Sequence, residues 1–112
     1  MFDYTKGTLV EVTPHKAVID VGGLGYLLHI PLSTYSKLTS SSQETRLYVS
    51  IVIREDSHKI YGFLTQQERD LFELIKEVSG IGPKTALTLV GHMEGTTLEL
   101  AISSAKGLDN ST

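Results

Sequence analysis

The chain has 112 residues, of which 40% are hydrophobic and 21% charged, and its formal net charge at pH 7 is −3. This composition is typical of one globular domain or of two very small ones. The sequence has no cysteine, which excludes disulfides, thiolate metal sites and iron–sulfur clusters. It shows no signal-peptide pattern and no apolar run of about 18 residues. We therefore expect a cytoplasmic protein with no cofactor, no metal and no membrane partner. Because the net charge is negative, any basic surface that binds nucleic acid must be confined to one part of the molecule.

The first half of the chain has a β pattern. Strands are predicted over residues 8–12, 16–21, 26–30, 46–54 and 58–63. The polar stretch over residues 31–43 predicts a loop with one helical turn. Gly22, Gly23 and Gly25 predict a bend where a small barrel turns a corner. A dinucleotide-binding loop would need a helix directly after these glycines, whereas a strand pattern follows.

The hydrophobic period becomes helical after Phe63. A capping box over residues 65–68 predicts the first helix, and its apolar stripe comprises Leu71, Phe72, Leu74, Ile75 and Val78. A proline predicts the start of a second helix, and its inward residues are Ala86, Leu87, Leu89 and Val90. A second capping box predicts a third helix over residues 96–105. The expected fold is thus α+β, with an OB-like or SH3-like barrel over residues 1–63 and a helical domain over residues 64–112.

A glycine-rich turn between the first two helices is the strongest candidate for a binding site. It comprises Gly80, Ile81, Gly82, Lys84 and Thr85. Glycines let the backbone approach a partner closely, and the first amides of the next helix are unpaired at the positive end of its dipole. This helix–hairpin–helix pattern predicts binding of DNA phosphates without regard to base sequence. The alternative is a tight turn that binds nothing.

Glu55 and Asp56 lie between two strand patterns and are predicted to form the tip of a hairpin. Paired carboxylates can perform acid–base or metal chemistry. From the charge pattern alone, the simpler interpretation is a solvated tip. The four histidines show no metal-ligand spacing, and they are His15, His29, His58 and His92.

The chain resembles the RuvA family of bacterial proteins that bind Holliday junctions. The segments that carry the resemblance are residues 21–26, 52–56, 60–63, 67–72 and 80–84. The family has an N-terminal OB-fold followed by a helical domain with two helix–hairpin–helix motifs. The resemblance implies a homotetramer that binds four-way junction DNA without enzymatic activity of its own. It also implies two protein partners in recombination and repair, the branch-migration ATPase RuvB and the resolvase RuvC.

The resemblance assigns roles to both candidate sites. Gly80, Gly82 and Lys84 match the first helix–hairpin–helix motif, and Glu55 and Asp56 match the acidic pin at the centre of the tetramer. Four acidic tips around one axis would repel phosphates where the DNA strands cross, and would disfavour unbroken duplex. The resemblance therefore reverses the interpretation of the tip as a merely solvated loop.

The sequence departs from the family pattern in its last residues. A second glycine hairpin is not found, and neither is the domain that contacts RuvB. The chain is therefore expected to be either a fragment or a shortened gene product, and its junction binding is expected to be weaker and more sensitive to salt than that of a complete protein. We also expect the helix over residues 67–78 to contact a neighbouring subunit through four charged residues, Glu68, Arg69, Asp70 and Glu73.

Two other functions remain open from the residues. Base-excision glycosylase/lyases also use a glycine hairpin, and some place a Schiff-base lysine where Lys84 stands. Such an enzyme would form a borohydride-trapped adduct with abasic DNA. The third possibility is a barrel module that binds only proteins, and it would show no junction binding at low salt.

Overall fold

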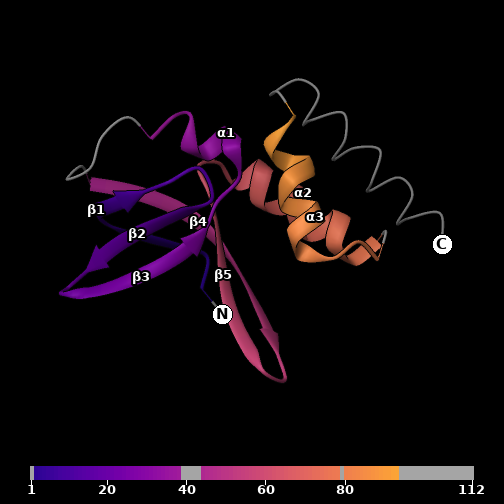
Figure 1. The fold of residues 1–112 in the computed structure, drawn as a ribbon, viewed down its shortest axis with the longest axis horizontal. Coiled ribbons are helices and arrows are strands. Elements are labelled where there is room, and N and C mark those ends of the chain that lie inside the picture. Colours follow the sequence, from indigo (N-terminus) through magenta and orange to yellow (C-terminus); the bar gives the residue numbers. More distant parts are fainter. Residues whose placement is uncertain (1, 39–43, 79, 94–112) are drawn as a thin grey trace.

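The fold is described from a computed structural model, which describes residues 2–38, 44–78 and 80–93 (Figure 1). Its elements are β1 (Tyr4–Val12), β2 (Lys16–Val21), β3 (Leu24–His29), α1 (Leu32–Tyr35), β4 (Glu44–Arg54), β5 (Ser57–Phe63), α2 (Gln66–Val78) and α3 (Pro83–Gly91). All five predicted strands are confirmed, and β1 begins four residues earlier than expected. The predicted helix over residues 96–105 lies outside the described residues.

The five strands close into a barrel in the order β1-β2-β3-β5-β4. Neighbouring strands are antiparallel except β3 and β5, which run parallel and pair Leu28 with Ile60 and His29 with Tyr61. The short helix α1 connects β3 to β4. The expected OB-like barrel followed by helices is therefore confirmed.

Residues of alternating strand positions fill the barrel. Because successive side chains of a strand point to opposite faces, one set from each strand is buried. The buried core residues are Leu9, Ala17, Ile19, Leu28, Ile30, Leu47 and Val49. This core is entirely apolar, so it stabilises the barrel but offers no polar group for binding a ligand.

The predicted bend at Gly22 and Gly23 is a tight hairpin turn. Val21 pairs with Leu24, so the two glycines alone connect β2 to β3. Their φ angles are 62° and 92°, a region that glycine adopts without steric cost. The Gly23 amide donates a hydrogen bond of 2.8 Å to Oδ1 of Asp20. The expected barrel corner is thus replaced by a two-residue turn.

Thr65 caps α2 as predicted, but Glu68 bonds to the Thr65 hydroxyl rather than to its backbone amide, so only half of the capping box forms. The Glu68 amide donates to Oγ1 of Thr65 at 3.2 Å, and the Glu68 carboxylate accepts from the same hydroxyl at 3.2 Å. The carboxylate also accepts a bond of 2.6 Å from Oγ of Ser33. Because Glu68 is buried in these contacts, its predicted role in pairing with a neighbouring subunit is wrong.

Arg69 is likewise used inside the subunit. Its Nη1 donates to the carbonyl oxygens of Asp3 at 2.9 Å and Val49 at 3.3 Å. Its guanidinium also lies within 4 Å of carboxylates of Asp3, Asp70 and Glu73. Arg69 therefore ties α2 to the barrel, and its predicted pairing across subunits is wrong.

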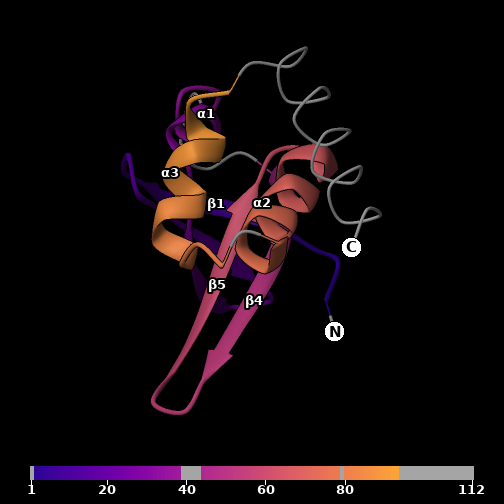
Figure 2. The same ribbon diagram turned by 90° about the vertical axis from the view of Figure 1, so that its right-hand side faces the viewer.

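The helices share a second hydrophobic cluster with strand β5. The cluster comprises Tyr61, Phe63, Leu71, Phe72, Ala86 and Val90. Leu87 packs against it, whereas Leu89 is 39% exposed, so the prediction that Leu89 faces inward is wrong. This packing fixes the beginning of α3 beside the β4–β5 hairpin (Figure 2).

Candidate nucleic-acid interface

Two glycines shape the turn between α2 and α3 for different reasons. Gly80 has a φ of 68°, in the left-handed region where side chains are strained. Gly82 has φ −65° and ψ 158°, which any residue adopts, and it caps α3. A Cβ added to Gly82 would meet no atom within 4 Å. Gly80 is therefore required by the turn, and Gly82 leaves the surface open to a partner.

The beginning of α3 presents free backbone amides. Pro83 is the first helical residue, and the first bond of the helix runs from the Ala86 amide to the Gly82 carbonyl at 3.0 Å. The amides of Lys84 and Thr85 precede this ladder, and both residues are exposed. They lie at the positive end of the helix dipole, so this end can hold an anion.

Ile81 lies differently from its neighbours in the turn. Its side chain is half-buried and packs against the second hydrophobic cluster. It therefore anchors the turn, while the exposed glycines and Lys84 remain available to a ligand.

Strands β4 and β5 form a long hairpin that projects beyond the barrel (Figures 1 and 2). Their pairing runs from Tyr48 and Phe63 out to Arg54 and Ser57. Glu55 and Asp56, as predicted, are the two residues of the tip, and both are exposed. The carboxylates are thus carried well away from the barrel core.

A hollow of about 260 Å³ lies between the hairpin stem and the beginning of α3. Its lining residues are Val52, Arg54, Ser57, Lys59, Tyr61, Gly82, Pro83, Lys84 and Thr85. Three of them are cationic, and none is acidic. Gly82, Lys84 and Thr85 were predicted as site residues from the sequence, whereas Arg54, Lys59 and Tyr61 were not. Strand alternation could have found Lys59, because it stands two residues before Tyr61 and so shares its face.

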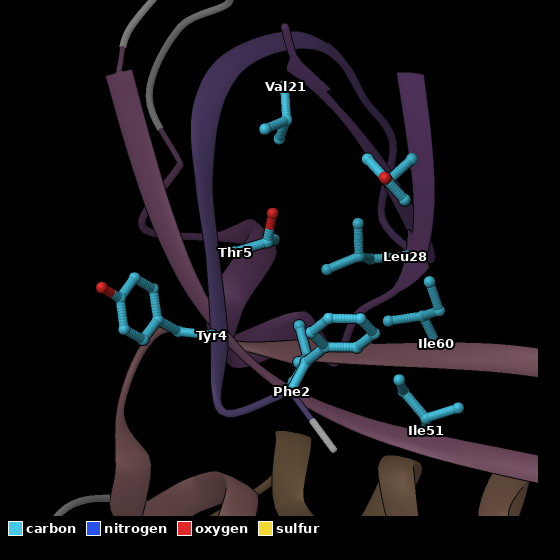
Figure 3. Close-up of a pocket in the computed structure, with 9 residues that line it drawn as sticks. Phe2, Tyr4, Thr5, Val21, Leu28, Ile51 and Ile60 are labelled. Atoms are coloured by element: carbon cyan, nitrogen blue, oxygen red, sulfur yellow. The ribbon is translucent and has the colours of Figure 1, made fainter. Parts of the chain in front are cut away.

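A second hollow, of about 240 Å³, opens at the barrel surface and is lined almost entirely by apolar groups. The side chains of Phe2, Leu28, Ile51 and Ile60 point toward one another there (Figure 3). Phe2 is 72% exposed. The lining offers no cation to a phosphate, so this hollow is unsuited to bind one.

His29 lies behind the basic hollow, next to Tyr61. The two ring centroids are 5.4 Å apart. Burial lowers the pKa of His29 below its usual value, and the nearby charges of Lys59 and Lys16 lower it further. The pKa of His29 therefore depends in part on the charge of Lys59.

In the described part of the chain, no group of three or more histidine, aspartate or glutamate side chains is placed to hold a metal ion. No helix among those residues is long and apolar enough to cross a membrane.

Comparison with known families identifies the barrel and its hairpin. The family model described as the RuvA N terminal domain matches residues 1–62, which is more than half of the chain. The chain belongs to the RuvA N-terminal domain family. The match includes Glu55 and Asp56 of the hairpin tip.

Relatives within the RuvA family extend the likeness beyond the barrel. Proteins named Holliday junction branch migration complex subunit RuvA are 46% identical over 102 residues in Protochlamydia amoebophila and 45% identical over 98 residues in Salinibacter ruber. A protein of that name in Lactococcus lactis is 41% identical over 105 residues. These alignments cover 91%, 88% and 94% of the chain but 51%, 48% and 53% of the relatives. The chain therefore spans about half the length of the curated relatives it matches.

The glycine turn lies inside the stretch shared with these RuvA relatives. An alignment over 91% of the 112 residues leaves out too few terminal residues to miss residues 80–84. Both parts of the candidate interface, the acidic tip and the beginning of α3, therefore lie within the stretch that aligns with these relatives.

Proposed function

We propose that this chain binds four-way DNA junctions through their sugar–phosphate backbone, without regard to base sequence, as a non-catalytic subunit of a branch-migration complex. The observation that carries the proposal is the pairing of two opposite electrostatic elements. An exposed helix terminus with Lys84 lies beside the stem of a hairpin whose tip carries Glu55 and Asp56. The names of the relatives support the same function.

The attractive element is the turn with the beginning of α3. A phosphate would accept hydrogen bonds from the amides of Lys84 and Thr85 and would pair with the Lys84 ammonium group. Gly80 and Gly82 allow the DNA to come close, and Ile81 holds the turn against the protein core. One such contact contributes about 0.3–2 kcal/mol. Useful affinity therefore requires several copies, which favours a homotetramer.

The repulsive element is the hairpin tip. Exposed carboxylates of Glu55 and Asp56 repel phosphates, and in a symmetric tetramer they would gather where the strands of a junction cross. An open junction has room for them, whereas continuous duplex places phosphates against them. Shape selectivity would therefore come from the acidic tips and affinity from the helix termini.

We propose that RuvB and RuvC are partners of the assembled complex. The RuvB contact predicted from the family falls in none of the described residues, and the proposal rests on the family alone. ATP hydrolysis is assigned to RuvB, and the present chain is assigned DNA binding.

A competition between a four-way junction and duplex of matched arm sequence tests the function. We expect the chain to prefer the junction, with the mass of the complex corresponding to four copies per DNA. Glu55→Gln combined with Asp56→Asn should raise duplex affinity about tenfold, because two repulsive charges are removed. The preference for the junction should then be lost.

Glu11→Gln combined with Glu44→Gln removes the same charge from exposed positions on the barrel. This control should leave the preference unchanged. A chain that binds junction and duplex equally well would refute the proposed selectivity. If both double variants raised duplex affinity equally, net charge rather than the tip would be responsible.

A further inference from the structure

Three cross-strand pairs show which face of the β4–β5 hairpin stem is turned toward the helices. Ser50 pairs with Tyr61, Val52 with Lys59, and Arg54 with Ser57. Because these residues alternate along both strands, they share one face of the hairpin. Tyr61 belongs to the second hydrophobic cluster and Val52 packs against it, so this face is the one turned toward α2 and α3.

The hollow on this face collects positive charge from three elements. Arg54 comes from β4, Lys59 from β5 and Lys84 from α3. None of the three forms a salt bridge with another described residue. The unpaired cations face one another across the hollow and beside the free amides of α3. Such an arrangement is unfavourable unless an anion lies between the cations.

Tyr61 provides a separate indication of a ligand. Its side chain is only 5% exposed and lies with its ring against Phe72, at a centroid distance of 4.9 Å. Burial raises its pKa, so the hydroxyl remains a proton donor. The residue forms part of the wall of the hollow, and its hydroxyl makes no hydrogen bond to any described residue. The ring is buried, but the hydroxyl is not a buried atom without a partner, so it is open to the hollow, where it can donate a hydrogen bond to a ligand.

We propose that the hollow binds one backbone phosphate of a DNA arm, held jointly by Lys59 of β5 and by the beginning of α3 with Lys84. This inference rests on the proposed function and adds the hairpin stem to the binding surface. Arg54 adds charge, and the Tyr61 hydroxyl donates the remaining hydrogen bond.

A shared phosphate would fix the distance between the attractive and repulsive parts of the interface. Lys59 is three residues from Asp56, which corresponds to about 10 Å along a strand. A phosphate seated at Lys59 would therefore hold the bound strand about 10 Å from the acidic tip. The same hairpin would grip the DNA at its stem and repel it at its tip.

The first measurement uses inorganic phosphate and follows backbone amides by NMR. We expect saturable shifts at Lys59, Lys84 and Thr85 that are lost together in Lys59→Ala. Lys6→Ala is the matched control, because it removes one lysine from β1, outside the hollow. Shifts that persist in Lys59→Ala, or that appear equally at Lys6, would overturn the shared site.

The second measurement uses the junction and its dependence on salt. Each neutralised phosphate contributes about −0.9 to the slope of log K against log salt. If Lys59 and Lys84 hold one phosphate, the double variant Lys59→Ala/Lys84→Ala should lose about 0.9 of slope for each bound copy of the chain, rather than about 1.8 for each copy. Each single variant should weaken binding about tenfold, as for a charge-assisted hydrogen bond. Additive slope losses would assign the two lysines to separate phosphates and refute the proposal.

A neutral methylphosphonate, introduced at one backbone position at a time, identifies the phosphate itself. We expect one position at which the methylphosphonate weakens junction binding by the unmodified chain but leaves junction binding by both single variants unchanged. Tyr61→Phe, which keeps the ring, should also weaken junction binding.

If the unmodified chain prefers the junction while Lys59→Ala binds it as Lys6→Ala does, the shared site fails and the proposed function stands. If the unmodified chain binds no junction, the proposed function fails, and the phosphate titration alone decides whether the hollow binds anions.

Discussion

The residues of the turn between α2 and α3 have different structural roles, and the sequence pattern alone does not distinguish these roles. Gly80 is needed for its backbone conformation, and Gly82 for the open surface above it. Ile81, between them, is turned inward against the core. A glycine–isoleucine–glycine pattern predicted a binding turn, but only the packed chain shows which of its members can touch a ligand.

His29 is expected to report on the charge of Lys59. Replacing Lys59 with alanine removes one cause of the lowered pKa, so the His29 pKa should rise toward its usual value in an NMR titration. It should remain below that value, because burial and Lys16 still lower it. Lys6→Ala should produce no change, and an unchanged His29 pKa in Lys59→Ala would show that the two groups do not interact.

The same shift sets the sign of a pH effect on stability. Since the folded pKa of His29 is lowered, the unfolded chain takes up this proton more readily. The free energy of unfolding should therefore fall as the pH drops below about 6.5. The fall should be smaller in Lys59→Ala, as measured by denaturation at several pH values.

Individual strands could be predicted from the sequence because half-buried strands alternate with a period of two. The predicted strand over residues 16–21 has the bounds of β2, and the hairpin tip is also correct. The hollow could not be predicted, because it depends on where α3 packs against the hairpin. That placement comes from contacts between residues distant in sequence, such as Phe63 and Phe72. Leu89 was wrongly predicted to face inward because α3 buries a narrower stripe than its apolar residues suggest.

At the scale of elements, β1 and β2 approach closely at Gly7. An alanine Cβ there would overlap the carbonyl oxygen of Asp20, which belongs to the backbone of β2. Gly7→Ala should therefore lower the free energy of unfolding by about 1–3 kcal/mol in chemical denaturation. Gly25→Ala is the matched control, because its Cβ would meet only Cγ1 of Val18 at 3.3 Å. An equal loss in both variants would mean that glycine flexibility, not the close approach, matters.

At the scale of the whole molecule, strand β5 supplies the buried barrel residues that pack against the helices. The second hydrophobic cluster contains Tyr61 and Phe63 of β5 together with side chains of α2 and α3. Arg69 adds hydrogen bonds from α2 to the backbone around Asp3 and Val49. We propose the boundary at residue 64 as a change of architecture, and we expect the two parts to unfold together.

Phe72→Ala tests this cooperativity. Phe72 is fully buried, with its ring centroid 5.1 Å from that of Phe63. Its truncation should cost about 3–5 kcal/mol. Hydrogen exchange should accelerate in β5 as well as in α2. Leu89→Ala, at an exposed position of α3, should have little effect. Faster exchange confined to the helices would indicate two independently stable units.

The projecting hairpin has a consequence for how the chain behaves in concentrated solution. β1 pairs with β4 no farther than Tyr48, and β3 pairs with β5 only at Ile60 and Tyr61. Beyond these pairs, the outer hairpin is a two-stranded ribbon with both edges open, and open edges invite strand addition by another molecule. Arg54, Glu55 and Lys59 charge this ribbon and oppose such edge-to-edge association. The charges that we propose to select junction DNA would thus also keep the exposed ribbon from acting as a template for aggregation.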